Sequence, residues 1–320
     1  MPDLQTQNPQ NSSTILAVLR FQIEQIQPKS ERQLEEVISS PSLTRKTLMT
    51  VAKLSQVDLF YREVGAGPPC LVMHGGLGLD HTCLHPWLDP LGRVLHLVYY
   101  DHRCNGRSGR PPINTLTFPQ LCEDADALRE HLGFDRIAVM GHSFGGFIGL
   151  EYALRYPQHL SHLILADTSP SLKYGKEILA NALQKCYSND IIAMLYAPPP
   201  ANDAEMKRNF RTILPLYFHT YNAKLADIVF TKTTWSAEAC RQSQLLMAEY
   251  DVSKKLNEIR VPTLIIAGED DFICPVSQAN LIHRGIPNSD LLIIEQAGHF
   301  PYVERPDAFF NPVLQWVRDH

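Results

Sequence analysis

The chain has 320 residues, of which 44% are hydrophobic and 20% charged, and its formal net charge at pH 7 is −5. This composition predicts a globular protein with a large core. The negative charge and the lack of a lysine- or arginine-rich run argue against nucleic acid or an anionic membrane as the main partner. Seven cysteines without CxxC spacing indicate reduced thiols in a cytoplasmic protein rather than disulfides or a zinc site.

Residues 1–50 differ from the rest of the chain. Ile15, Leu19 and Ile23 follow helical spacing, so we expect one amphipathic helix that ends near Pro28. The apolar stretch here is too short for a secretory signal, and no run in the sequence is long enough to span a membrane. We therefore predict an N-terminal helical extension that carries no catalytic residue.

From residue 51 onward, short apolar runs alternate with helical patterns. The first is the alternating segment VDLFYREVG, and Thr117, Pro119 and Gln120 indicate the start of a later helix. Apolar strands that alternate with helices predict an α/β fold, with a mostly parallel sheet and helices on both faces. The further strands are expected at residues 70–74, 94–101, 136–141, 162–167, 263–268 and 291–296. The core domain should comprise residues 51–169 and 251–320.

Residues 170–250 interrupt this alternation. They are richer in charged and aromatic residues, and APPPA at 197–201 should break their helices. An insertion between two strands would cover the edge of the sheet where the strands end, which is where ligands bind in open α/β sheets. The sequence therefore predicts a helical cap that encloses the site and selects the substrate.

The segment Gly141-His142-Ser143-Phe144-Gly145 has the G-x-S-x-G pattern, with an apolar strand before it and a helix after it. On so tight a turn the serine takes a strained backbone conformation that exposes its hydroxyl, and the two glycines let the helix cross the strand without a clash. Ser143 is therefore the predicted nucleophile.

A serine hydroxyl needs a base, and the base needs an orienting carboxylate. His299 follows the last strand and is the predicted base, whereas we interpret His142 as a structural residue behind the turn. The segment GEDDFICP supplies the carboxylate. We choose Asp271, with Asp270 as its closest rival and Asp167 as a separate alternative. The chain order of serine, aspartate and histidine is the one expected for this architecture.

The tetrahedral intermediate needs two N–H donors for its oxyanion. The backbone of Phe144 should supply one, and Gly76 in the segment HGGLG should supply the other. We interpret residues 101–103 and 106–108 as a buried polar group under the site, with paired charges and no catalytic role.

Five segments together resemble the α/β-hydrolase fold superfamily, and within it the proline iminopeptidase-like branch, over residues 52–318. They are HGGLGLDHT, YYDHRCNGRSGRP, GHSFGG, GEDDFICP and AGHFPYVERPD. The resemblance implies a nucleophile, an acid and a base at Ser143, Asp271 and His299. It also implies oxyanion donors at Gly76 and Phe144 and a helical cap.

The chain departs from proline iminopeptidases at several positions. These enzymes usually have proline at the position of Leu77, tryptophan at that of Phe144 and glycine at that of Cys104. They also bind the amine of the substrate with cap carboxylates. The candidates here are Glu205, Asp227, Glu238 and Glu249.

Three functions remain open from the sequence. We favour a serine hydrolase acting on a small ester, lactone or amide, with a proline iminopeptidase and a slowly hydrolysing ligand receptor as alternatives. The expected partner is a small molecule or a short peptide. Without a GxGxxG after the first strand or a cluster of metal ligands, the sequence implies neither a cofactor nor a metal. It predicts no oligomeric state.

Overall fold

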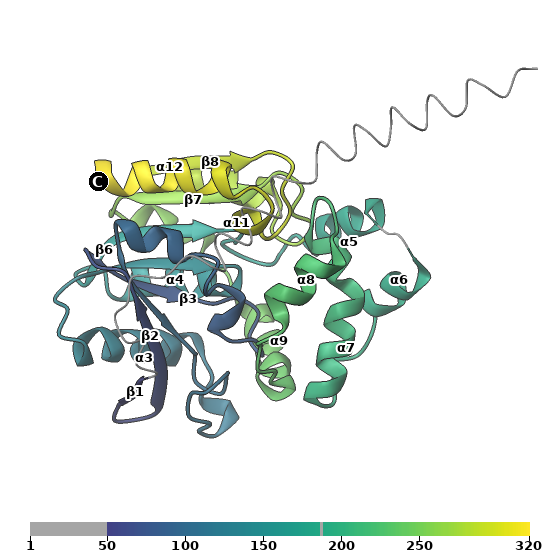
Figure 1. Ribbon diagram of the computed structural model, residues 1–320, viewed down its shortest axis with the longest axis horizontal. Helices are drawn as coiled ribbons and strands as arrows, with labels where there is room; N and C mark the ends of the chain where they lie inside the picture. The colour runs from purple at the N-terminus through teal and green to yellow at the C-terminus, as the bar shows by residue number, and fades with distance from the viewer. Residues whose placement is uncertain (1–49, 186–187) are drawn as a thin grey trace, which may run out of the picture. The chain divides into compact units, whose positions relative to one another are not determined.

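The computed structural model describes residues 50–185 and 188–320, and its central element is an eight-stranded sheet (Figure 1). Its strands are β1 (Thr50–Lys53), β2 (Asp58–Val64), β3 (Pro69–Met73), β4 (His96–Tyr100), β5 (Ile137–His142), β6 (Leu160–Ala166), β7 (Thr263–Gly268) and β8 (Ser289–Ile294). The predicted N-terminal helix lies outside the described residues.

The order of the strands is β1-β2-β4-β3-β5-β6-β7-β8. The pairings of β1 with β2 and of β2 with β4 are antiparallel, and all the others are parallel. Every residue of β5 and β7 is buried, as expected of parallel strands covered on both faces. The predicted α/β fold with a mostly parallel sheet is thus confirmed. β1 was not predicted, because a four-residue edge strand is too short to show a clear alternation of apolar and polar residues.

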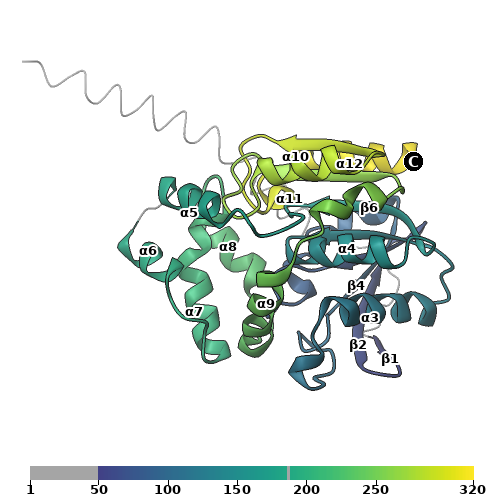
Figure 2. The same ribbon diagram turned by 180° about the vertical axis from the view of Figure 1, so that it is seen from behind.

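Helices cover both faces of the sheet (Figures 1 and 2). On one face lie α3 (Phe118–His131), α4 (Phe144–Arg155) and α10 (Val276–Gly285), and on the other lies α12 (Pro306–Asp319). The short helix η2 (Asp89–Arg93) contacts α12. Thr117 caps α3 as predicted, because its side chain accepts a hydrogen bond from the N–H of Gln120 at 3.4 Å. The Gln120 side chain donates to Asp124 at 3.3 Å instead of returning to the cap.

The segment between β6 and β7 is helical and lies beyond the carboxyl ends of the strands (Figure 1). It comprises α5 (Gly175–Gln184), α6 (Asn189–Leu195), α7 (Asp203–Ile213), η4 (Leu214–Tyr217), α8 (Ala223–Phe230) and α9 (Ala237–Glu249). The proline run at 197–201 separates α6 from α7. We call residues 170–250 the helical insertion.

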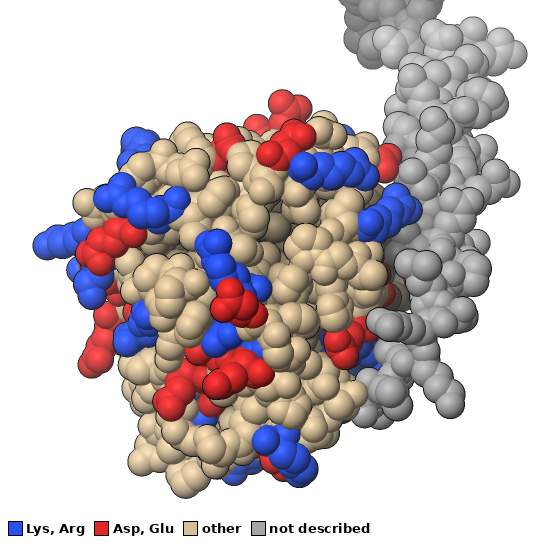
Figure 3. Space-filling view, turned by 90° about the vertical axis from the view of Figure 1, so that its left-hand side faces the viewer, with Lys and Arg blue, Asp and Glu red and all other residues tan. Residues whose placement is uncertain are grey.

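Acidic and basic side chains are interspersed on the face shown in Figure 3. Within residues 50–185 and 188–320, no helix combines the length and the apolar character needed to cross a membrane.

Candidate active site

Ser143 lies at the turn between β5 and α4, with backbone angles φ 55° and ψ −122°. Such a conformation is strained for a residue other than glycine, and strain of this kind concentrates at functional sites. The flanking glycines leave no room for a side chain. A Cβ on Gly141 would lie 2.3 Å from the carbonyl oxygen of Gly145, and a Cβ on Gly145 would lie 2.0 Å from that of Met73. The turn therefore requires glycine at both positions.

Asp271 and His299 meet at the edge of the sheet, in the loops that follow β7 and β8. Nδ1 of His299 donates to Oδ2 of Asp271 at 2.7 Å, while Oδ1 accepts the N–H groups of Ile273 and Cys274 at 3.0 and 3.1 Å. Burial opposes ionisation of Asp271, but His299 and these hydrogen bonds hold the pKa of the carboxyl below its ordinary value. An ionised carboxylate on Nδ1 leaves Nε2 as the basic atom of the ring.

The two rival carboxylates have other partners. Asp270 pairs with Nδ1 of His219, and Oδ1 of Asp167 accepts the N–H of Gly268 at 2.8 Å. Burial, together with the charge of Asp271, raises the pKa of Asp167 well above its ordinary value, which favours the neutral acid. The structure therefore brings Asp271 to His299 and holds Asp270 away from it.

His142 contacts the predicted base. Its Nε2 lies 2.8 Å from the backbone oxygen of His299, and the two rings are 4.7 Å apart. Because a carbonyl oxygen can only accept, His142 carries its proton on Nε2. Burial and the proximity of His299 lower the pKa of His142 to about 3, so its ring is neutral. This residue therefore holds the backbone of His299 without adding charge.

The glycine-rich loop after β3 runs beside the serine. A Cβ on Gly75 would lie 2.8 Å from Cβ of Ser143, and the next residue, Gly76, has a φ of 36°. Phe144 is the first residue of α4, so its N–H has no acceptor within the helix. The loop and the start of α4 thus flank the serine from two sides, which is the arrangement that two oxyanion donors need.

The structure does not join the serine to the base by a hydrogen bond. Within the described residues, Ser143 Oγ has no such contact with His299, although both lie at the same edge of the sheet. Ser143 is only partly buried, whereas His299 is 2% exposed. Hydrogen bonds between a nucleophile and its base often shorten only when substrate binds.

Aromatic side chains of the helical insertion reach the base. The Tyr217 ring lies 5.3 Å from His299, and Phe210 lies 5.5 Å from Tyr217. Met206, one turn before Phe210, packs on the glycine-rich loop, since a Cβ on Gly78 would lie 2.5 Å from its Cε. These side chains span the distance from that loop to His299. Three further aromatic residues belong to the same cluster, namely Phe230, Trp235 and Phe300. We use the name aromatic roof for the five aromatic residues Phe210, Tyr217, Phe230, Trp235 and Phe300.

The carboxylates considered for an amine site do not form a buried partner for a substrate. Glu205 accepts a backbone N–H at the start of α7, and Asp227 pairs with Arg211 at 2.7 Å. Glu238 and Glu249 are exposed. The four side chains considered are thus engaged elsewhere or solvated.

Residues 101–103 and 106–108 were expected to form a buried polar group with paired charges, and the structure agrees for only some of them. Arg103 is 1% exposed and forms an ion pair with Asp124 at 2.6 Å, and Asp101 is fully buried. Arg107 is exposed instead of buried, and its guanidinium lies 5.1 Å from the centre of the ring of the buried Phe60.

Among residues 50–185 and 188–320, two groups of side chains have the spacing of metal ligands. They are Asp271, Cys274 and His299, and Asp80, His81 and Asp101. In the second group, Oδ2 of Asp80 accepts the N–H of Thr234 at 2.9 Å and Oδ2 of Asp101 accepts that of Arg107 at 2.8 Å. Donors within the protein therefore already engage these carboxylates.

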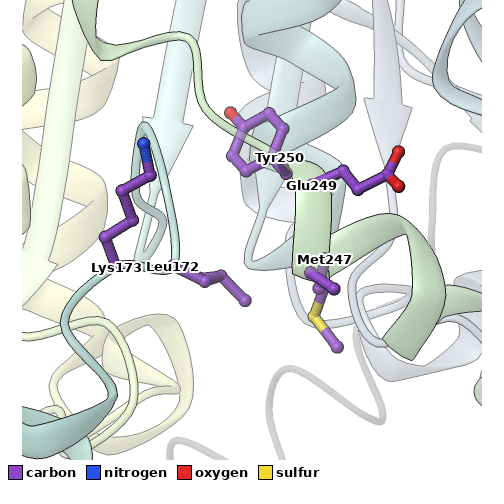
Figure 4. Close-up of a pocket in the computed structure, with 6 residues that line it drawn as sticks. Leu172, Lys173, Met247, Glu249 and Tyr250 are labelled. Atoms are coloured by element: carbon purple, nitrogen blue, oxygen red, sulfur yellow. The ribbon is translucent and has the colours of Figure 1, made fainter.

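A pocket of about 230 Å³ lies where the helical insertion joins the sheet domain (Figure 4). At this junction the N–H of Val252 donates to the carbonyl oxygen of Pro170 at 2.8 Å. This hydrogen bond links the two segments that connect the helical insertion to the sheet domain. The pocket is lined by Leu172, Lys173, Met247, Ala248, Glu249 and Tyr250. None of these is a predicted catalytic or oxyanion residue.

Residues 68–306 match the model of a protein family described as alpha/beta hydrolase fold. A proline iminopeptidase, PfmaB, from Pestalotiopsis fici is 27% identical over 284 residues, which cover 85% of this chain and 99% of that protein. A putative carbamate hydrolase, RutD, from a Caulobacter species is 30% identical over 270 residues, 82% of this chain and 96% of that protein.

Among solved structures, an alpha/beta fold family hydrolase from Bacillus anthracis superposes with a TM-score of 0.71. The two chains are 22% identical, and the match covers 85% of this chain and 99% of the other. At this identity the likeness shows the fold alone.

Proposed function

The chain belongs to the alpha/beta hydrolase fold family, and on this premise we propose that it is a serine hydrolase that cleaves a small ester or lactone through an acyl-enzyme. The observation that carries the proposal is the buried hydrogen bond between Asp271 and His299 at the sheet edge where Ser143 occupies its strained turn. A neutral histidine oriented by a carboxylate is what a serine hydroxyl needs in order to react.

In the proposed reaction, Ser143 Oγ attacks the carbonyl carbon of the substrate while its proton passes to Nε2 of His299. The resulting oxyanion accepts hydrogen bonds from the N–H groups of Gly76 and Phe144. The oxyanion then collapses, the bond to the leaving alcohol breaks, and His299 returns the proton to that oxygen. Water, activated by the same histidine, cleaves the acyl-enzyme and regenerates Ser143.

The environment of the site favours a substrate without a charged amine. In the aromatic roof, the ring of Tyr217 contacts His299 and the ring of Phe210 packs on Tyr217. Aromatic walls of this kind favour an apolar acyl group or ring in the substrate. An ammonium group buried there would be costly without a carboxylate partner. The four cap carboxylates considered do not provide one, and this supports an ester or lactone over an N-terminal peptide.

A proline iminopeptidase is the second candidate, and the similarity to PfmaB favours it. The two functions share their nucleophile and differ in the contact with the free amine of the substrate.

The test is a panel of p-nitrophenyl esters, lactones and proline-β-naphthylamide, with the wild type and Ser143→Ala. We expect a burst of nitrophenol with esters in the wild type alone, and no release of naphthylamine. Release of naphthylamine that depends on Ser143 would establish the aminopeptidase instead.

A further inference from the structure

The backbone around His299 is held by partners from three separate parts of the chain. Its N–H donates to the carbonyl oxygen of Tyr217 at 2.7 Å, and its carbonyl oxygen accepts from His142. The N–H of the preceding residue, Gly298, donates to Oε2 of Glu304 at 2.7 Å. Glu304 lies in α11 (Pro301–Glu304), directly after the loop of the base. The place of the base therefore depends on a carboxylate outside the predicted triad.

The same carboxylate holds the part of the helical insertion that contacts the base. Oε1 of Glu304 accepts the N–H groups of His219 and Thr220 at 2.8 and 3.3 Å. These residues follow Tyr217 closely, and Tyr217 touches His299 with both its ring and its carbonyl oxygen. The side chain of Glu304 thus links the loop that carries His299 to the segment that carries Tyr217.

We propose that Glu304 is a positioning residue that holds His299 in reach of Ser143 and couples this loop to the helical insertion. The inference rests on the proposed function, because the step it serves is the transfer of the Ser143 proton to His299. The carboxylate accepts its hydrogen bonds from backbone N–H groups and not from the ring of His299 or the hydroxyl of Ser143. It acts through the backbone of Gly298 and through the segment that carries Tyr217.

The charged and titratable groups that face Glu304 come from several elements. His219 pairs with Asp270, Lys185 at the end of α5 donates to the backbone oxygen of Asp270, and Asp167 follows β6. Burial raises the pKa of Glu304 to about 7, against the lowering effect of its three N–H donors and of His219.

The charge of Glu304 decides how well it can hold the loop. An ionised carboxylate can accept from all three N–H groups at once. Protonation places a hydrogen on one of the two oxygens, where it competes with an N–H donor. Protonated Glu304 should therefore hold the loop of the base less firmly, and the fully active form should be the ionised one.

The test uses the rate at which a fluorophosphonate probe labels Ser143 in the full-length protein, which requires no knowledge of the substrate. Wild type, Glu304→Gln and the matched control Glu295→Gln are compared from about pH 5 to about pH 9. Glu295 is an exposed carboxylate at the end of the neighbouring strand. Glu304→Gln should be labelled on the order of tenfold more slowly at the alkaline end, since an amide cannot accept all three bonds. The control should match the wild type.

The pH dependence of the labelling rate distinguishes a positioning role of Glu304 from a purely structural one. In the wild type, protonation of Glu304 should add to the fall in the labelling rate as the pH drops through about 7. Glu304→Gln lacks this proton, so its labelling rate should fall less steeply over the same range.

Equal rates and equal slopes in wild type and Glu304→Gln would overturn the inference and leave the proposed function standing. A wild-type labelling rate that stays constant between about pH 8 and about pH 6 would also overturn it, even if the glutamine variant does not fold. Failure of the probe to label Ser143 in the wild type would contradict the proposed function, and this inference with it.

Discussion

Nδ1 of His299 and Oδ2 of Asp271 lie 2.7 Å apart, although the two residues come from different loops and are 28 positions apart in the chain. The loops meet because β7 and β8 are parallel neighbours, whose carboxyl ends lie at the same edge of the sheet. Asp270 is one residue away, yet it pairs with His219. The direction of a single side chain thus decides which carboxylate orients the base.

Asp271→Asn should lower kcat/KM by a factor on the order of 10³ or more, because an amide cannot stabilise the protonated ring or fix its tautomer. Asp270→Asn should cost less than about tenfold. Steady-state kinetics with a p-nitrophenyl ester measures both. A larger loss in Asp270→Asn would show that the acid has been assigned to the wrong residue.

Ser143→Ala should remove nearly all turnover, with a loss on the order of 10³ or more, and leave the fold intact. A fluorophosphonate probe should label the wild type at Ser143, as identified by mass spectrometry of the digested protein, and should not label the variant. Substantial turnover in the alanine variant, with an unchanged circular dichroism spectrum, would contradict the assignment of Ser143 as the nucleophile.

His142 should make the stability of the protein sensitive to acid. The unfolded chain binds a proton on this ring near the ordinary histidine pKa of about 6.5, whereas burial and His299 lower the folded pKa to about 3. The unfolded state therefore binds more protons between these values, and the free energy of unfolding falls as the pH drops through that window. By about pH 5 the loss due to His142 should be on the order of 2 kcal/mol.

Urea denaturation at about pH 8 and about pH 5 tests this expectation. His142→Gln should show a smaller difference between the two pH values than the wild type does. His131→Gln, at an exposed histidine, is the matched control and should retain the wild-type difference. An undiminished difference in His142→Gln would contradict the account.

Two glycine substitutions separate a steric clash from backbone strain. Gly133 has a φ of 76°, and a Cβ added there would meet nothing within 4 Å, so Gly133→Ala should cost about 1 kcal/mol through its conformation alone. Gly145→Ala would place a methyl group 2.0 Å from the backbone oxygen of Met73 and should prevent folding. Soluble yield and thermal melting measure both effects. Normal melting of Gly145→Ala would mean that the turn at Ser143 can relax.

The parts of this protein that could be predicted depend on local pattern. The buried strands appear as apolar runs, and the turn at Ser143 appears as glycines at fixed spacing, so both are visible in a few consecutive residues. The edge strand β1 was not predicted because four residues are too few to show an alternation of apolar and polar side chains. Arg107 was misplaced because its contact with Phe60 joins residues 47 positions apart.

The sequence by itself determined the fold class and the candidate nucleophile, because hydrophobic period and turn chemistry are properties of neighbouring residues. Only the tertiary structure decided that Asp271 rather than Asp270 faces His299, that His142 donates to the backbone of His299, and that Glu304 ties this loop to the helical insertion. These contacts join distant segments, and a shift of one residue or one rotamer would exchange one partner for another. The directions of side chains at the sheet edge are set by the packing of the whole chain.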